Sequence, residues 1–279
     1  MARKNFFEMM EREIDFQNEY EKIENILLNK RVKAGKTLDD LIELQFKNWK
    51  YRQNYTSFWE LRCKMDFTYY QTDQYPIQWE TDRKDVKLAD FLLYVEMVLN
   101  MFSLLHSFSE ILVKETINLV IETIRYDLEK INHEVTDLGD GHLIVTQKDA
   151  AAAAVADIVE PDLAKAVIQY NHHLLKNDLG AKKEILKRMA DALEPKRSKL
   201  KAANSTLESD FFMLVNKMNI RHNNCDPEDR AKYVEPFAKL TPRQKENWYD
   251  DIYQEGLMAF LTLEQVERNK RIADFKALF

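Results

Sequence analysis

The residues best suited to chemistry gather between positions 216 and 224. This short run carries the polar side chains Asn216, Lys217, Asn219, Arg221, His222, Asn223 and Asn224. An imidazole transfers protons near neutral pH, and a guanidinium stabilises negative charge on a phosphoryl group. An arginine beside a histidine among carboxamides fits RNA cleavage without a metal, in which the imidazole moves a proton and the guanidinium stabilises the charged phosphorane. The cluster is therefore the candidate site of the chain.

An apolar helix leads directly into this cluster. Its buried face is predicted from residues that recur at a spacing of three and four, namely Leu207, Phe211, Leu214, Val215 and Met218. The same register carries His222 to the end of the buried stripe, with Asn219 and Asn223 within side-chain reach of it. We predict a polar pocket at the edge of the core. The alternative is a helix C-cap, because asparagine is common at helix ends.

A basic stretch precedes the cluster. Between Lys182 and Lys201, eight basic residues face three acidic ones, although the whole chain carries a formal net charge of −6. Such a run is most often a solvated helix face, but beside the cluster it also fits a surface that follows a phosphate backbone. The candidate RNA-contacting residues are Lys187, Arg188, Lys196, Arg197 and Lys217.

Composition predicts an all-α fold. Only 5 Gly and 6 Pro interrupt 279 residues that are 45% hydrophobic and 32% charged, so turn residues are too scarce for an all-β fold. We expect a multi-helix bundle with at most one short β-hairpin, at His142 to Gln147, after the turn at Asp137 to Gly141. The expected organisation is an N-terminal helical region over 1–136, a hairpin connector over 137–148 and a C-terminal helical domain over 149–279.

Further helices follow from hydrophobic periodicity and from proline positions. We predict helices from Asn5 to Asn29, from Thr37 to Tyr70 and, in the most apolar part of the chain, from Asp85 to Asn132. Helix starts are predicted at Ala150, Pro161, Pro227 and Thr241-Pro242, with a kink or restart at Pro195.

The last predicted helix, from Pro242 to Leu278, changes its apolar face along its length. One face is marked by Trp248, Ile252, Ala259, Leu263 and Val266. Toward the terminus the apolar residues shift to another face, with Leu257, Leu261, Ile272, Phe275 and Phe279. Self-association is one explanation for this second face.

Other kinds of site lack support in the sequence. Cys63 and Cys225 have no paired spacing, which argues against a disulfide framework or a zinc knuckle. Neither His106, His133 nor the pair His172-His173 has a matching metal-ligand pattern, so we expect no metal and no cofactor. No uninterrupted apolar run approaches the ~18 residues of a bilayer crossing, and the N-terminus lacks the apolar core of a signal peptide. We expect a cytoplasmic protein that does not enter a membrane.

The run Asn216-Lys-Met-Asn-Ile-Arg-His-Asn-Asn224, at the end of an apolar helix in an all-helical chain, resembles the HEPN-type domains of bacterial abortive-infection and toxin-type proteins. The resemblance covers roughly residues 161–261. Members are helical bundles that commonly dimerise so that arginine and histidine residues of two chains line one cleft, and many are metal-independent ribonucleases of phage defence or toxin-antitoxin pairs.

The resemblance implies a catalytic pair of Arg221 and His222, supported by Asn216 and Asn219. It also implies RNA as the substrate, a homodimer, and an antitoxin or a phage-derived trigger protein as a partner. Here Arg221 and His222 are adjacent, whereas the usual motif separates its arginine from its histidine. The alternative function is a catalytically inactive helical interaction or sensor module that dimerises.

Overall fold

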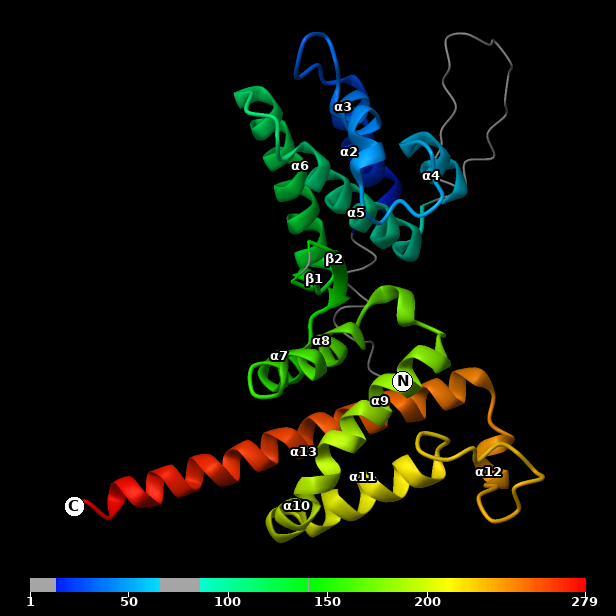
Figure 1. Ribbon diagram of the computed structural model, residues 1–279, viewed down its shortest axis with the longest axis vertical. Coiled ribbons are helices and arrows are strands. Elements are labelled where there is room, and N and C mark those ends of the chain that lie inside the picture. The colour runs from blue at the N-terminus through cyan, green and yellow to red at the C-terminus, as the bar shows by residue number, and fades with distance from the viewer. Residues whose placement is uncertain (1–13, 66–85, 140) are drawn as a thin grey trace. The chain divides into compact units, whose positions relative to one another are not determined.

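The structure is a computed structural model that describes residues 14–65, 86–139 and 141–279 (Figure 1). The chain forms two compact units, Met1–Gln147 and Lys148–Phe279. Each unit has its own hydrophobic core. Helices make up nearly all of the regular structure in the described ranges, and a two-stranded antiparallel hairpin is the one sheet there. The predicted all-α fold with one short hairpin is confirmed.

The first unit packs its helices around α5. Its elements are α2 (Phe16–Asn29), α3 (Leu38–Gln45), the 3-10 turn η2 (Phe46–Asn48), α4 (Phe58–Lys64), α5 (Leu88–Phe102), η3 (Ser103–Leu105), α6 (Ile111–Lys130), β1 (His133–Asp137) and β2 (Leu143–Gln147). Nearly every residue of α5 from Phe91 to Phe102 is buried, which explains its continuous apolar sequence. The part of the first predicted helix before residue 14 lies outside the described residues.

The predicted single helix from Thr37 to Tyr70 is wrong. Thr37 does form a capping box with Asp40, in which each backbone amide donates to the other side chain. The helix nevertheless stops at Gln45, and the chain then turns at Gln53, whose φ of +52° is incompatible with a continuing right-handed helix. Ser57 begins α4 as its N-cap, and the residues beyond Met65 in this prediction lie outside the described ranges.

A buried polar network connects four helices of the first unit. Arg62 of α4 donates to Glu24 of α2 and, at 2.8 Å, to Asp39 of α3. The hydroxyl of Tyr94 on α5 donates to the other oxygen of Glu24. Because the arginine is paired with both carboxylates, its burial leaves no isolated charge in the core.

The predicted helix from Asp85 to Asn132 is two helices, α5 and α6. Ser103 Oγ donates to the Asn100 carbonyl at 2.7 Å, and the last turn of α5 tightens into η3. Such a side-chain bond to the backbone competes with the regular helical pattern. The chain then leaves helical geometry before Ile111 starts α6.

The hairpin is an integral part of the first unit. Its strands pair with Val135 opposite Val145, and side chains of α5 bind the other edge of β2. Asn100 accepts from the Leu143 amide at 3.0 Å and donates to the Leu143 carbonyl at 2.7 Å, while Glu96 accepts from the Val145 amide at 2.7 Å. The segment expected as a connector over 137–148 is therefore packed against α5, and the boundary between the units follows Gln147.

One helical window has the length and composition of a bilayer crossing. Among the described residues, Leu88–Leu105 have a mean hydropathy of 1.7 over 18 residues, although Asp90, Glu96 and Asn100 interrupt the apolar sequence. About two thirds of it (67%) is buried within the fold, so core packing accounts for its apolar composition.

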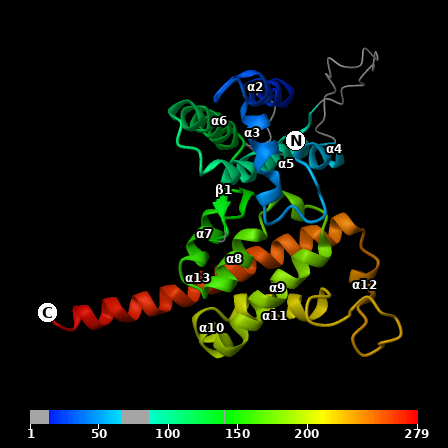
Figure 2. The same ribbon diagram turned by 45° about the horizontal axis from the view of Figure 1, so that its top comes forward.

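The second unit is built around the long helix α13. Its elements are α7 (Ala150–Ala156), α8 (Pro161–Gln169), η4 (His173–Leu175), α9 (Leu179–Leu193), η5 (Glu194–Lys196), α10 (Arg197–Ala203), α11 (Ser205–Lys217), α12 (Glu235–Ala238) and α13 (Pro242–Lys276). Figure 2 shows α13 running beside α9, with α10 and α11 next to them. At Gly256 the packing is closest, because a Cβ there would lie 2.7 Å from Met189 Cε.

Most of the predicted helix starts in this unit are confirmed. Helices begin at Ala150, Pro161 and Pro242, and η5 with Pro195 separates α9 from α10. The predicted start at Pro227 is wrong. The Asp226 side chain accepts from the Glu228 amide and closes only a turn, and the next helix is α12.

Candidate functional site

The candidate cluster lies on the loop that follows α11. This helix ends at Lys217, and the next turn is closed by Asn219, whose φ of +63° is left-handed. The helix therefore does not extend to His222, whose side chain is exposed rather than at the core edge as predicted. A left-handed residue after the C-cap is a common helix stop, and asparagine tolerates this conformation well. Asn216 lies in the last turn of α11 and is half-buried.

Two asparagines hold the loop closed by reciprocal hydrogen bonds. The Asn219 amide donates to Asn224 Oδ1 at 2.9 Å, and the Asn224 amide donates to Asn219 Oδ1 at 3.1 Å. Asn224 is almost fully buried, and its Nδ2 donates to the Lys232 carbonyl at 2.6 Å. Burial raises the pKa of the neighbouring Tyr249 to about 12, and a hydrogen bond with the Asn219 side chain opposes this rise. The two asparagines thus close the loop, and Asn219 takes the left-handed position directly after the C-cap residue Met218. An asparagine at the helix end is what the C-cap alternative expected.

Arg221 anchors the loop to α9 and to the following turn η5. Its guanidinium donates to Glu194 and, at 2.9 Å, to the Ala190 carbonyl, while Asp191 lies 3.7 Å away. The guanidinium carbon lies 5.5 Å from the centre of the Phe212 ring. The side chain is only 17% exposed, and its hydrogen bond holds the pKa of Glu194 below the ordinary value. Two carboxylates therefore already occupy the positions that a phosphate would take.

Arg197 is engaged in the same way. It donates to the buried Glu208, lies 3.6 Å from Glu194 and is centred 4.4 Å from the Phe212 ring. Arg197 and Arg221 thus share one carboxylate and one aromatic ring. The hydrogen bond to Glu208 raises the pKa of Arg197 above its ordinary value. Both arginines are committed to holding α10, α11 and the loop together.

The other predicted RNA-contacting residues are at the surface. Lys187, Arg188, Lys196 and Lys217 have exposed side chains. Lys196 lies over the ring of Phe260 at 5.9 Å. Within the ranges that the structure describes, Lys187, Arg188 and Lys217 form no ion pair. These three side chains are open to solvent and form no ion pair among the described residues, whereas Arg197, whose side chain is 45% exposed, is paired with Glu194 and Glu208.

A buried ionic network in the second unit was missed by the sequence reasoning. Lys182, counted there in the basic stretch, is buried and lies 2.9 Å from Glu246 and 2.7 Å from Asp250. The Tyr170 hydroxyl donates to the same Asp250 oxygen at 2.9 Å. The available signal was spacing, because Lys182 precedes the buried Ile185 by three residues and so shares its face. This network connects α8 and α9 to α13.

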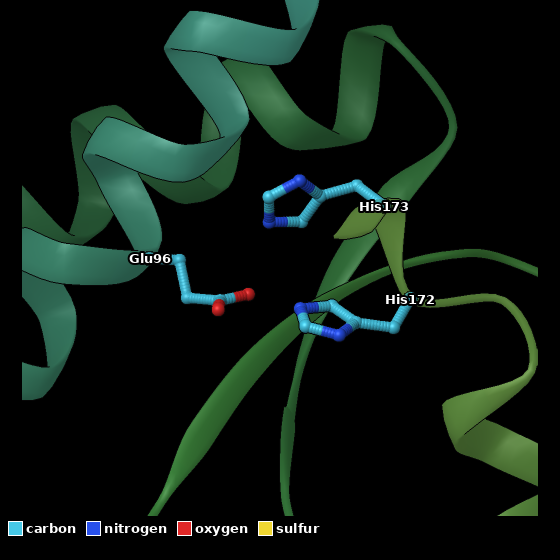
Figure 3. A group of neighbouring side chains, drawn as sticks. All are labelled: Glu96, His172 and His173. Carbon is cyan, nitrogen blue, oxygen red and sulfur yellow. The ribbon is translucent and has the colours of Figure 1, made fainter. Parts of the chain in front are cut away.

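The adjacent histidines His172 and His173 lie beyond the end of α8. Their rings meet edge to face with centroids 4.8 Å apart (Figure 3). The helix α8 ends at Gln169, and His173 begins the 3-10 turn η4, so the two histidines do not lie on one helix face. Glu96, also drawn in Figure 3, belongs to α5 of the first unit, where it binds the Val145 amide.

The C-terminal part of α13 carries a second candidate surface. Figures 1 and 2 both show this end of the helix extending past α7 and α10 of its own unit. From Gln265 onward every residue is exposed, including Ile272, Phe275 at 60% and Phe279 at 96%. Large exposed apolar side chains in one region mark an interaction surface. We name Leu261, Ile272, Phe275 and Phe279 the terminal stripe.

The two candidate surfaces differ in what they can do. The loop after α11 presents one exposed imidazole on a fixed backbone, whereas the terminal stripe presents apolar area without chemistry. No protein-family model, curated protein or solved structure matches this chain.

Proposed function

We propose that this protein is a cytoplasmic helical interaction module that self-associates through the terminal stripe of α13. The observation that carries the proposal is the exposure of large apolar residues on a helix that extends beyond its own core. A 35-residue helix whose last third contacts little of its own unit gains little stability from its amphipathic sequence unless another surface covers it.

The direction of the stripe supports an external partner. Successive residues of a helix are rotated by about 100°. On this geometry the stripe lies about a third of a turn away from the face that Ile252, Tyr253 and Phe260 bury in the core. One edge of the core-facing side nevertheless lies in line with the stripe, because Leu257 is fully buried and Leu261 packs against the core. Beyond the part of α13 that its own unit covers, the stripe is exposed and needs another surface to cover it.

The free energy gained by burying the stripe, compared with the cost of association, is consistent with a dimer of moderate affinity. Burying a large apolar side chain stabilises by roughly 1.5–3 kcal/mol. Ile272, Phe275 and Phe279 from two copies supply six such side chains, or roughly 9–18 kcal/mol before the cost of association. That cost is about 4–15 kcal/mol, so we expect a dissociation constant on the order of micromolar.

The arrangement around Arg221 also favours an interaction module over an enzyme. The guanidinium is paired with Glu194, and the Asn219 side chain accepts from the Asn224 amide and closes the loop. A substrate phosphate would have to displace the Glu194 carboxylate, which already accepts a hydrogen bond from this guanidinium. Two of the four expected site residues thus have structural roles in this fold.

Sedimentation velocity on the full chain tests the proposal. The variant Ile272→Ser with Phe275→Ser should remain monomeric at concentrations where the parent dimerises. The matched control is Lys270→Ser with Ala273→Ser, which changes two exposed residues of the same turns on the other side of the helix. A parent that stays monomeric up to high micromolar concentration would overturn the proposal.

A metal-independent endoribonuclease in phage defence is the second candidate, and one observation favours it. The imidazole of His222 is exposed on a loop that the Asn219–Asn224 bonds hold fixed. A fixed, solvent-facing imidazole meets the first requirement of a proton-transfer group. Incubating total RNA with the protein in EDTA tests this: His222→Gln should reduce cleavage by about 10²-fold, whereas Asn223→Gln should not. If the parent protein does not cleave RNA under these conditions, the ribonuclease candidate is excluded and the interaction module is the remaining candidate.

A further inference from the structure

We infer that the partner of the terminal stripe is a second copy of the same helix running antiparallel to it. The inference rests on the proposed self-association and adds the orientation. It starts from the order of charges beside the stripe, which runs Glu264, Glu267, Arg268, Arg271. Read backwards, this order has a base at every place where it has an acid when read forwards. Two copies that run in opposite directions therefore place acids opposite bases, and we call this order a charge palindrome.

An antiparallel pair makes this palindrome complementary. With the two-fold axis between Glu267 and Arg268, Glu264 of each copy lies level with Arg271 of the other. Opposite charges at such flanking positions of paired helices set orientation and partner choice. In a parallel pair the two copies of this flank would lie on opposite sides of the interface, so Glu264 of one copy would not meet Arg271 of the other and the complementarity would be lost.

The contacts within one chain show that Glu264 and Arg271 share one flank of the helix. Arg271 lies 3.1 Å from Glu264 across two turns, and Arg268 lies 3.9 Å from the same carboxylate. Both arginine side chains are more than half exposed, at 55% and 65%, so they are free to exchange this carboxylate for that of a second copy. Glu267 lies toward Lys199, 3.7 Å away, and so is turned further from the second copy than Glu264.

The apolar residues agree with the same axis. Counting from the point between residues 267 and 268, Leu261 lies level with position 274 of the second copy, in the turn between Ile272 and Phe275. The largest exposed side chains of one copy thus meet the partly buried Leu261 at the edge of the other copy's core. Arg268 lies in the middle of the stripe and faces the centre of the pair. A polar residue at one central position fixes register at a cost in stability.

Distance measurement between spin labels tests the orientation. The protein would carry one label at Ala277→Cys in a Cys63→Ser, Cys225→Ser background, after sedimentation has shown that this background dimerises. At a rise of 1.5 Å per residue, two labels in an antiparallel pair are separated by about 28 Å along the axis. A parallel pair would hold them roughly 10–15 Å apart, at the spacing of packed helices. The short distance would overturn the inference while leaving the self-association intact, and a monomeric background would overturn both.

Charge reversal tests the pairing itself. Glu264→Arg and Arg271→Glu should each weaken the dimer by about 3- to 10-fold in low salt. An equimolar mixture of the two variants should recover the parent affinity, because each antiparallel heterodimer then contains only opposite charges. Lys276→Glu, on the opposite flank of the stripe, is the matched control and should change the affinity less. A mixture that stays as weak as its components would contradict the Glu264–Arg271 pairing.

Discussion

Asn224 is the residue on which the loop after α11 depends most. It is buried and satisfies the Asn219 amide and the Lys232 carbonyl with one side chain. Asn224→Ala leaves these backbone groups without their partner, so it should destabilise the protein by about 2–3 kcal/mol. Asn223→Ala, at the exposed neighbouring position, should change the free energy of unfolding by less than about 0.5 kcal/mol. Urea unfolding of both variants measures this, and equal stabilities would contradict the structural role.

Substitutions of the adjacent residues Arg221 and His222 should differ clearly in their effect on the stability of the protein. Arg221→Ala removes the bonds to Glu194 and Ala190 and the contact with Phe212, so we expect a loss of about 2 kcal/mol. His222→Gln changes an exposed side chain and should leave the melting temperature nearly unchanged. Thermal unfolding followed by circular dichroism checks both. A destabilised His222→Gln protein would show that the imidazole has a partner in solution.

Asp127 gives the first unit a dependence on pH. Burial, with Glu19 nearby, raises the pKa of this carboxyl to about 6, and its Oδ2 has no hydrogen-bond partner among the described residues. Because the folded state binds the proton more tightly than the unfolded chain, the stabilisation is present below about pH 4 and is lost as the pH rises through 6. The Asp127→Asn variant should not lose stability as the pH rises. At pH 7 its free energy of unfolding should exceed that of the parent by about 2 kcal/mol. Urea unfolding between pH 4.5 and 7 tests it, and parallel pH profiles would contradict it.

The sequence predicted which residues are polar and clustered, but not which partners they meet. Arg221 pairs with Glu194, and Lys182 pairs with Glu246 and Asp250. These partners are tens of residues away, so no local pattern contains the pairing. Only the C-cap role of Asn219 follows from local chemistry, because asparagine adopts the left-handed conformation at low cost.

At the scale of elements, Gly256 sets how closely α13 approaches α9 and α11. A Cβ there would lie 2.7 Å from Met189 Cε and 3.2 Å from the Phe211 ring. Gly256→Ala should therefore destabilise by about 1–3 kcal/mol despite the higher helix propensity of alanine. Gly180→Ala is the control in the first turn of α9, where the nearest atom is a side-chain oxygen at 3.4 Å, and it should be neutral or stabilising. Chemical unfolding compares the two, and a stabilised Gly256→Ala protein would contradict the close packing.

Helix starts were predictable wherever a local signal decides them. Thr241 caps α13 with proline in the first turn, and the alanine run forms α7 directly after Asp149. Helix ends were less predictable. The aromatic stretch after α3 keeps a helical spacing of apolar residues, yet the chain leaves the helix there because Gln53 turns and Ser57 starts α4. In this part of the chain tertiary packing overrides periodicity.

At the scale of the whole molecule, the two cores are separate, and each helix serves one of them except for the end of α13. The change of apolar face in this helix was visible in the sequence, since spacing alone defines it. The exposure of this segment could not be predicted from the sequence, because it depends on where the core of the unit ends. The self-association that we propose for this segment would connect the fold to a function.

Hydrogen exchange of residues 264–276 at several protein concentrations tests this account most directly. In a monomer the exposed end of α13 should exchange rapidly, because few contacts oppose local opening. We predict that its protection rises with protein concentration by about 10-fold or more across the dissociation constant, while the protection of α9 and α11 stays constant. Rapid exchange of this segment at every concentration would contradict the account.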